Sequence, residues 1–348
     1  MKKKLDLIWA IGIACFFMAM FSITLWRGKD KILQFNSESS TILETIDDVY
    51  TNSIVGKYSL AYIDSKLSYY GRSGRNMNAT RTLMGKDDWL FLKDNLDAYL
   101  GNVTYSEQEI SNMVEQYTEL KDFFEGYGCE FVLFVAPNKM SVYDNQMPDY
   151  YEKTASTYDT DRLVSILKDS TGMNVLFPLE EMLSVRDEFQ LYYKYDTHWN
   201  SLGAYVGVQT ILEALNEETT ALSQGMIEIV EFVEHDSAKD DLADMIGMSE
   251  YFVEECDFAI KGSYEMDYIE SYVAGIYQNE AAPNSEKVLF IGDSFRCDMV
   301  SYLVDNYCEV YQIHSDNFDK TLLETYTPDI VIYEVVEREF MNIGKSEE

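Results

Sequence analysis

Apolar and polar residues fall into blocks along the chain, and these blocks predict strands and helices in turn. Continuous apolar runs are typical of strands buried on both faces of a parallel sheet. One such run covers 129–136, and further strands rich in apolar residues are expected at 288–291, 309–313 and 330–335. Between them, apolar residues recur at helical spacing over 110–124, preceded by the capping-box residues Ser106 and Glu109, and again over 202–215. The alternation predicts an α/β fold with a mostly parallel sheet covered on both faces.

Shorter patterns extend this alternation. Strands are expected at 88–92 and 173–177, and helices at 161–167, 295–307 and 318–326. The pattern weakens between 216 and 285, where acidic residues accumulate. We therefore predict an acidic insertion at about 216–285, with short strands at 228–233 and 268–277.

The N-terminus has a different character. Three lysines follow Met1, and the stretch 7–26 is uncharged and of the roughly 20-residue length that crosses a bilayer. No small-residue cleavage site follows it, so we expect an uncleaved signal anchor with the large acidic part outside the cell. The expected organisation is a cytoplasmic tip and transmembrane helix at 1–26, a juxtamembrane stalk at 27–82, and a catalytic domain at 83–348.

Composition narrows the classes of partner and cofactor. The 348 residues are 47% hydrophobic and carry a formal net charge of -34, which opposes binding to nucleic acid. The five cysteines form no C-x-x-C pair and have no histidine at metal spacing. We therefore expect neither a zinc site nor a disulfide framework, and no cofactor.

One serine is placed for nucleophilic chemistry. Ser294 follows the run 288–291 in the sequence Gly292-Asp293-Ser294, ahead of a predicted helix. A strand that turns into a helix presents such a hydroxyl at the carboxyl edge of the sheet, where backbone N–H groups stabilise an oxyanion. We expect Asp293 to cap the helix rather than to react.

A serine nucleophile needs a base, and the chain has three histidines to choose from. His198 is preceded by Asp196 at a spacing that lets both side chains face the same way in an extended segment. His235 lies in the acidic insertion and is expected to be exposed. His314 follows a predicted strand at the same sheet edge and is the rival. We favour an Asp196–His198–Ser294 triad; the alternative is a structural Asp–His pair and a serine in a tight turn.

With these residues in place, the chain resembles the SGNH-hydrolase-like O-acetyltransferases of the alginate-acetylation type, and especially the DHHW-motif group. The resemblance covers most of 83–338. It rests on the segments 88–91, 136–139, 196–199 with 203–204, 292–295 and 335–338, together with Tyr143 and Pro148. In that group the Asp and His precede the nucleophile, an order permuted relative to ordinary SGNH esterases. Thr197 departs from the DHHW motif, which has its first His there.

The resemblance implies a three-layer α/β/α, flavodoxin-like domain in which Ser294 is the nucleophile, His198 the base and Asp196 its orienting carboxylate. Asn138 is the candidate oxyanion donor, although Asn138 and Lys139 equally fit an ordinary turn. Further substrate-contact candidates are Lys139, Trp199, Tyr195 and Arg296, with Tyr192 and Tyr193 beside them. Arg296 also fits an ordinary surface residue. The implied partner is a multi-pass membrane O-acyltransferase that donates acetyl groups.

Three functions remain open at this point. The first is a membrane-anchored, extracytoplasmic O-acetyltransferase that acylates an exopolysaccharide or cell-wall glycan through an acyl-serine. The second is an acetyl-esterase that uses the same triad with water as the acceptor. The third is a tethered scaffold or glycan-binding protein with a vestigial triad. The residues alone do not choose between transfer and hydrolysis.

Overall fold

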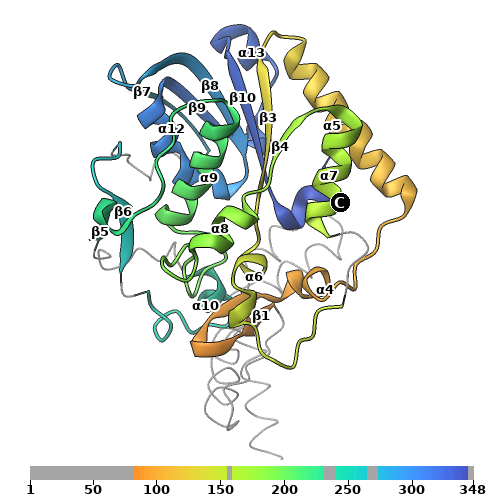
Figure 1. Cartoon of the computed structure of the whole chain (residues 1–348), viewed down its shortest axis with the longest axis vertical. Coiled ribbons are helices and arrows are strands. Elements are labelled where there is room, and N and C mark those ends of the chain that lie inside the picture. The colour runs from red at the N-terminus through yellow and green to blue at the C-terminus, as the bar shows by residue number, and fades with distance from the viewer. Residues whose placement is uncertain (1–80, 155–158, 231–239, 255, 265–272, 344–348) are drawn as a thin grey trace, which may run out of the picture. The chain divides into compact units, whose positions relative to one another are not determined.

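The computed structural model describes residues 81–154, 159–230, 240–254, 256–264 and 273–343. The chain divides into two units, Met1–Ser73 and Gly74–Glu348, and every described residue belongs to the second (Figure 1). No helix within these described ranges is both long and apolar enough to cross a membrane. The predicted transmembrane segment 7–26 and residues 27–80 of the predicted stalk lie outside them, so the predicted domain boundaries remain predictions.

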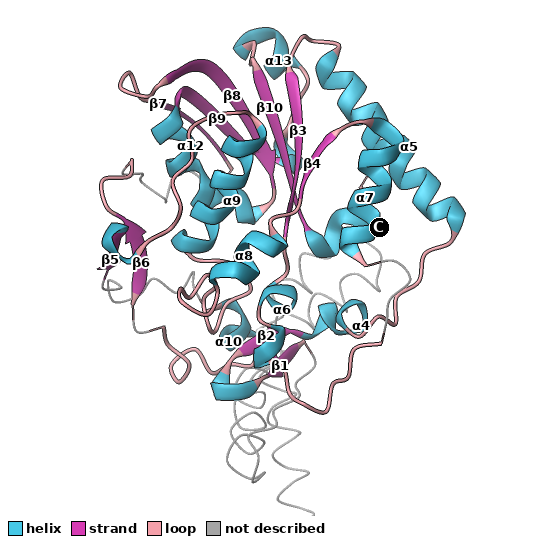
Figure 2. Cartoon of the chain, in the orientation of Figure 1, coloured by secondary structure: helices cyan, strands magenta, loops and turns pink. Residues whose placement is uncertain are grey.

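A six-stranded sheet forms the centre of the second unit (Figure 2). Its strand order is β4-β3-β10-β8-β9-β7, and all neighbours are parallel except β7, which runs antiparallel to β9. The strands span Glu130–Ala136 (β3), Asn174–Leu176 (β4), Ala274–Gln278 (β7), Asn284–Gly292 (β8), Tyr307–His314 (β9) and Ile330–Val336 (β10). The strands expected from the sequence at 129–136, 288–291, 309–313 and 330–335 become the four central strands, as predicted.

Helices cover both faces of this sheet, and the strand alternation explains how (Figure 1). Val132 and Phe134 of β3 join one apolar cluster, while Leu133 and Val135 join the other. The first cluster includes residues of α8 (Leu179–Val185), α9 (Ser201–Ala214) and α12 (Val300–Asn306). The second includes residues of α5 (Glu107–Glu125), α7 (Thr160–Thr171) and α13 (Thr321–Tyr326). The predicted three-layer α/β/α fold is therefore confirmed.

Smaller elements surround the carboxyl edge of the sheet. They comprise the antiparallel pair β1 (Thr82–Met84) and β2 (Leu90–Leu92), and the short helices α4 (Leu96–Tyr99), α6 (Lys139–Val142) and α10 (Asp241–Met245). The predicted capping box at the start of α5 is formed, because Ser106 and Glu109 bond each other's backbone N–H groups. The predicted helix over 295–307 is instead a 3-10 turn, Ser294–Met299 (η6), followed by α12.

The predicted acidic insertion at about 216–285 is part of the same folded domain as the sheet. It contains the antiparallel pair β5 (Ile227–Val230) and β6 (Asp257–Ile260), of which the sequence pattern predicted only the first. It also supplies β7, which extends the main sheet. In addition, α10 contacts β1 and β2, so the insertion packs against the carboxyl edge of the sheet.

Candidate active site

The turn after β8 positions the predicted nucleophile. Asp293 caps η6 as expected, with its Oδ1 accepting from the Phe295 N–H at 2.9 Å. Its Oδ2 accepts from the N–H of Val336, the last residue of β10, at 3.0 Å. The turn is thus fixed to two neighbouring strands. Ser294, the first residue of η6, is half-buried at the carboxyl edge of the sheet.

Gly292 is required in this turn by lack of space rather than by backbone conformation. A Cβ atom there would lie 2.8 Å from Cβ of Glu334, and closer still to Glu334 Oε2. Gly292→Ala should therefore lower the free energy of unfolding by about 1–3 kcal/mol and displace Ser294. Chemical denaturation and acetyl-ester turnover check this. The matched control is Gly225→Ala, because a Cβ atom there meets nothing within 4 Å; equal behaviour of the two variants would contradict the crowding argument.

Arg296 stabilises the same turn from beneath. Its side chain is fully buried and donates to Gln312 Oε1 at 2.7 Å and to the carbonyls of Gly292 and Asp293 at 3.2 and 2.5 Å. The prediction that Arg296 contacts a polar substrate is therefore corrected: a guanidinium with no exposed surface orders the turn instead. The alternative of a surface residue is wrong as well.

The base lies on a tight loop that precedes α9. Tyr192 and Trp199 pair across this loop, and Asn200 caps α9 with its side-chain oxygen. Trp199 is completely buried, and its indole N–H donates to the carbonyl of Phe295 at 3.0 Å. Trp199 was predicted to contact substrate, but its burial excludes this. It joins the loop of the base to the turn of the nucleophile.

The three triad candidates form one hydrogen-bonded chain. His198 Nε2 lies 2.7 Å from Ser294 Oγ, and His198 Nδ1 lies 2.7 Å from Asp196 Oδ1. The backbone N–H of His198 also donates to Asp196 Oδ1, at 2.8 Å. The carboxylate therefore fixes both the orientation and the tautomer of the ring, which leaves Nε2 free to accept the serine proton. The His198 side chain is 27% exposed and Ser294 is half-buried, so a substrate can reach both.

The electrostatics suit a general base. Burial lowers the pKa of His198, but the hydrogen bond and charge of Asp196 outweigh it, and the net pKa is raised above its ordinary value. Burial opposes ionisation of Asp196, yet the bonds from His198 and from the Asp241 N–H hold the pKa of Asp196 below its ordinary value. His314, the rival base, accepts from the Asp316 N–H at 3.3 Å and caps its own turn.

A second carboxylate, Asp241 of the predicted insertion, supports the catalytic loop, which is the loop that carries Asp196 and His198. Its N–H donates to Asp196 Oδ2 at 3.2 Å, and its side chain accepts from the N–H and hydroxyl of Thr197 at 2.7 and 2.5 Å. Thr197, which stands at the first His of the DHHW motif, thus has a definite structural partner. Sequence reasoning missed Asp241, because nothing distinguishes it from the many other acidic residues of the insertion.

Lys139 is a buried support rather than a substrate contact. It is 4% exposed, and its Nζ donates to the carbonyls of Leu90, Lys194 and Asp196 at 2.7, 2.8 and 3.0 Å. These three bonds occupy all three ammonium donors, which corrects the prediction of a ligand contact. Burial lowers the pKa of Lys139 to about 7 despite the nearby charge of Glu254. Lys139 joins β2 to the catalytic loop.

The tyrosines before Asp196 fall into two groups. Tyr192 and Tyr193 are buried, and their hydroxyls donate to Pro137 O at 2.5 Å and Asp257 Oδ2 at 2.8 Å, so neither lines a sugar site. Tyr195 is half-buried, and its ring packs 5.3 Å from that of Phe252. Its predicted contact with substrate remains a prediction.

Asn138, the candidate oxyanion donor, lies in the loop after β3. It is 5% exposed, and its N–H donates to Glu337 Oε2 at 2.7 Å. Its side-chain oxygen is buried and has no hydrogen-bond partner among the described residues. The role of its amide group in catalysis stays a prediction. Glu337 also accepts from Ser141 and Thr160 at 2.7 and 2.9 Å, so it fixes this loop to the end of β10.

Asp196, His198 and Asp241 offer ligand atoms within 4.8 Å of one another, a grouping that could hold a metal ion. The same atoms serve the hydrogen bonds described above: Asp196 orients the imidazole, and Asp241 accepts from Thr197. Because these atoms are already used in hydrogen bonds with one another and with Thr197, the arrangement fits a proton-transfer triad better than a metal site.

Comparisons with known proteins agree with this geometry. A protein-family model described as "SGNH hydrolase-like domain, acetyltransferase AlgX" matches residues 82–310. A protein from Pseudomonas syringae pv. tomato, named "Probable alginate O-acetylase AlgJ", is 23% identical over 316 residues, which covers 84% of this chain and 75% of that protein.

Two solved structures have a similar fold. PatB1 from Bacillus cereus superimposes with a TM-score of 0.53 at 15% identity, covering 74% of this chain and 96% of that chain. The O-acetyltransferase domain of Pseudomonas putida AlgJ superimposes with a TM-score of 0.51 at 17% identity, covering 76% of this chain and 93% of that chain. At these identities the structures support the fold alone.

Proposed function

Because the chain belongs to the family of SGNH hydrolase-like acetyltransferase domains of the AlgX type, we propose that Ser294 carries an acetyl group to a sugar hydroxyl. Membership in this family identifies the chain as an enzyme of the O-acetyltransferase type. The observation that supports the acyl-serine route is the continuous chain of 2.7 Å contacts from Asp196 through His198 to Ser294.

In the first half-reaction, Ser294 Oγ attacks the carbonyl carbon of an acetyl donor while His198 Nε2 takes the hydroxyl proton. A tetrahedral oxyanion forms, and Asn138 is our candidate donor to it. When the oxyanion collapses, the bond to the leaving group breaks and His198 gives that group its proton. Ser294 is left as an acetyl ester, and His198 is neutral again.

In the second half-reaction, a sugar hydroxyl attacks the acetyl carbon, and His198 takes its proton. Collapse of this second intermediate breaks the ester bond to Ser294, and Oγ recovers a proton from His198. The product is an O-acetylated sugar. The Ser294 hydroxyl is restored, and His198 is neutral again. Asp196 stabilises the imidazolium in both halves, as its lowered pKa allows.

The proposed setting follows from the N-terminal sequence. We place the enzyme at the cell membrane, anchored by segment 7–26, with the catalytic domain outside and acting on an exopolysaccharide or cell-wall glycan. The acetyl donor is then a multi-pass membrane O-acyltransferase, because a domain outside the cell needs acetyl groups carried across the bilayer.

The test uses the full-length chain in detergent with a chromogenic acetyl ester, with and without glycan oligomers. Transfer predicts oligomers heavier by one acetyl group in mass spectrometry, with less free acetate released when oligomer is present. Free acetate alone, at a rate that oligomers do not change, would instead assign the esterase reaction. If neither acetylated oligomer nor free acetate is formed, the non-catalytic scaffold is favoured.

A further inference from the structure

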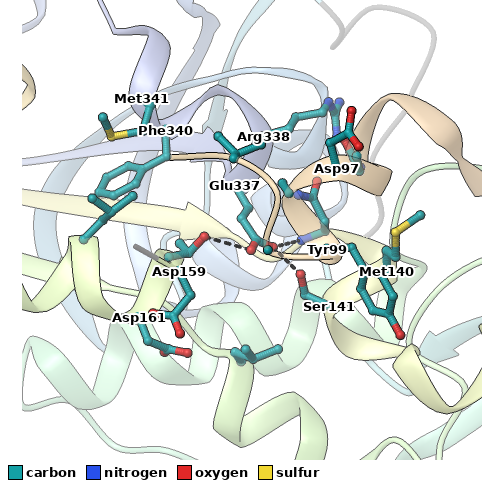
Figure 3. A pocket seen from close by; sticks show the side chains of 18 of the residues that line it. Asp97, Tyr99, Met140, Ser141, Asp159, Asp161, Glu337, Arg338, Phe340 and Met341 are labelled. Carbon is teal, nitrogen blue, oxygen red and sulfur yellow. Dashed lines mark hydrogen bonds between the residues drawn. The ribbon is translucent and has the colours of Figure 1, made fainter. Parts of the chain in front are cut away.

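A cavity of about 610 Å³ lies among the segments at the carboxyl edge of the sheet (Figure 3). Of the described residues that line it, none belongs to the triad. Helix α4, the start of α7 and the segments that follow β3 and β10 form its walls, and Asn138, Glu337 and Arg338 lie on the last two. Tyr99 contributes an aromatic ring, one face of which Lys153 covers at 4.5 Å from the ring centre. The volume lies in the range of small-ligand pockets.

The topology places this cavity at the same edge of the sheet as the triad. Strands β3, β10 and β8 are parallel neighbours, so the residues after Ala136, Val336 and Gly292 gather at one edge. The guanidinium carbon of Arg338 lies 5.5 Å from the ring centre of Phe295, and that ring lies 4.9 Å from the ring of His198. The side chains of Arg338 and Phe295 thus lie between the cavity and His198.

The lining is dominated by hydrogen-bond acceptors. Of the described residues that line it, five carry carboxylates and two carry cations. The carboxylates are Asp94, Asp97, Asp159, Asp161 and Glu337. Arg338 faces the Phe295 ring, and Lys153 lies 3.6 Å from Asp144 and 4.5 Å from the Tyr99 ring centre. Asp94 pairs with Arg81 at 2.9 Å, and Glu337 accepts from three donors of the protein. Five carboxylates against two cations still leave the lining with three more negative than positive charges. The cavity thus presents negative charge to a ligand.

A further acceptor lies deeper in the wall. The buried Oδ1 of Asn138 has no hydrogen-bond partner among the described residues, although a buried polar atom normally has one. A rotation of the Asn138 side chain toward the cavity would bring this atom within reach of an O–H or N–H group of a bound sugar. Partial burial raises the pKa of Asp161, and the charges of its acidic neighbours Asp159 and Glu180 raise it further. A carboxylate brought here by a ligand meets repulsion rather than pairing.

We propose that this cavity is the acceptor site and that it accepts glycans without carboxylates, with amino sugars bound most tightly and uronates excluded. The inference rests on the proposed transferase function and goes beyond it by naming the acceptor chemistry. It separates this chain from its relative named for alginate, a polyuronate. The formal net charge of -34 acts in the same direction, because it repels a polyanion at long range.

Isothermal titration calorimetry of the full-length chain in detergent tests the proposal with three tetrasaccharides of equal length. We expect a glucosamine oligomer to bind more tightly than a neutral glucose oligomer, and a mannuronate oligomer to bind at least about tenfold more weakly than either. The preference should shrink as salt is raised, because charge causes it. A mannuronate oligomer that binds as tightly as the glucosamine oligomer would overturn the proposal.

Asp161→Asn tests the cavity itself, since it removes one charge and keeps the side-chain shape. We expect this variant to lower the ratio of glucosamine-oligomer affinity to mannuronate-oligomer affinity about threefold or more. If Asp161→Asn folds poorly, Asp97→Asn at an exposed position of the cavity replaces it, and the ratio should fall in the same way. The matched control is Asp122→Asn, on the exposed face of α5 outside the cavity, which should leave the ratio unchanged. Equal ratios in the cavity variants and the control would refute this location.

The two proposals fail in different ways. If ester turnover depends on Ser294 but none of the oligomers binds, the acceptor site is refuted and the proposed chemistry stands. If Ser294→Ala still transfers acetyl groups, the proposed function fails whatever the cavity binds.

Discussion

Ser294→Ala should lower kcat/KM for acetyl-ester turnover by at least about 10³-fold and abolish labelling of the protein by the acetyl group. The reason is that the hydroxyl 2.7 Å from His198 Nε2 is the only atom proposed to carry the acetyl group. Any residual rate reflects binding and oxyanion stabilisation without covalent catalysis. Steady-state kinetics and intact-protein mass spectrometry after a rapid quench measure the two effects.

The control for this variant is Ser184→Ala. Ser184 is exposed on α8, and its hydroxyl bonds only the carbonyl of Glu181 among the described residues, so turnover and labelling should match the parent. A Ser294→Ala protein that keeps its fold by circular dichroism and still acquires one acetyl group would contradict the acyl-serine mechanism.

Asp196→Asn should lower kcat/KM by about 10⁴-fold. Asp196 Oδ1 accepts from two N–H groups of His198, and Oδ2 accepts from the Asp241 N–H. Either orientation of an asparagine amide therefore sets an N–H₂ group against another donor. The ring of His198 loses its fixed orientation, and the amide no longer stabilises an imidazolium.

The same variant should change the pH profile. His198 acts when neutral, and its pKa is raised above the ordinary value of 6.5, so parent activity should fall as pH drops through a midpoint above 6.5. In Asp196→Asn the strongest interactions that raise this pKa are gone, while burial, which lowers it, remains. The acid limb of kcat/KM should therefore move to lower pH.

Asp241→Asn provides the comparison for that shift. The charge of Asp241 also raises the pKa of His198, but less than Asp196 does, so its limb should move in the same direction by a smaller amount. Profiles of the parent and both variants between about pH 5 and 9 decide the matter. A limb that stays fixed or moves to higher pH in Asp196→Asn would show that His198 is not the titrating base.

The sequence predicted those features that depend on local pattern. Runs rich in apolar residues gave the central strands, and the cap at Asp293 was evident from its place between a strand and a helix. The pairing of His198 with Ser294, 96 positions apart, could be inferred because only three histidines compete. Few candidates of a residue type make a long-range contact predictable.

The sequence did not predict which polar residues are buried. Lys139 and Arg296 resemble surface residues in the sequence, yet both are enclosed. Carbonyl oxygens from distant segments converge on Lys139, whereas Arg296 bonds two carbonyls of its own turn and the side chain of Gln312 on β9. Burial of this kind depends on tertiary packing, which no periodicity records. For the same reason, the carboxylates of Asp241 and Glu254 could not be separated from the general acidity of their segment.

Segment 240–254, which contains α10 and several buried apolar residues, supports the loop that carries His198. Asp241 bonds Thr197, and Glu254 accepts from the N–H of Tyr195, so two side chains of this segment hold residues next to Asp196 and His198. A chimera that transplants only the histidine loop into a homologous scaffold leaves this support behind. A chimera made to accept new sugars should therefore transfer the loop of His198 and segment 240–254 together.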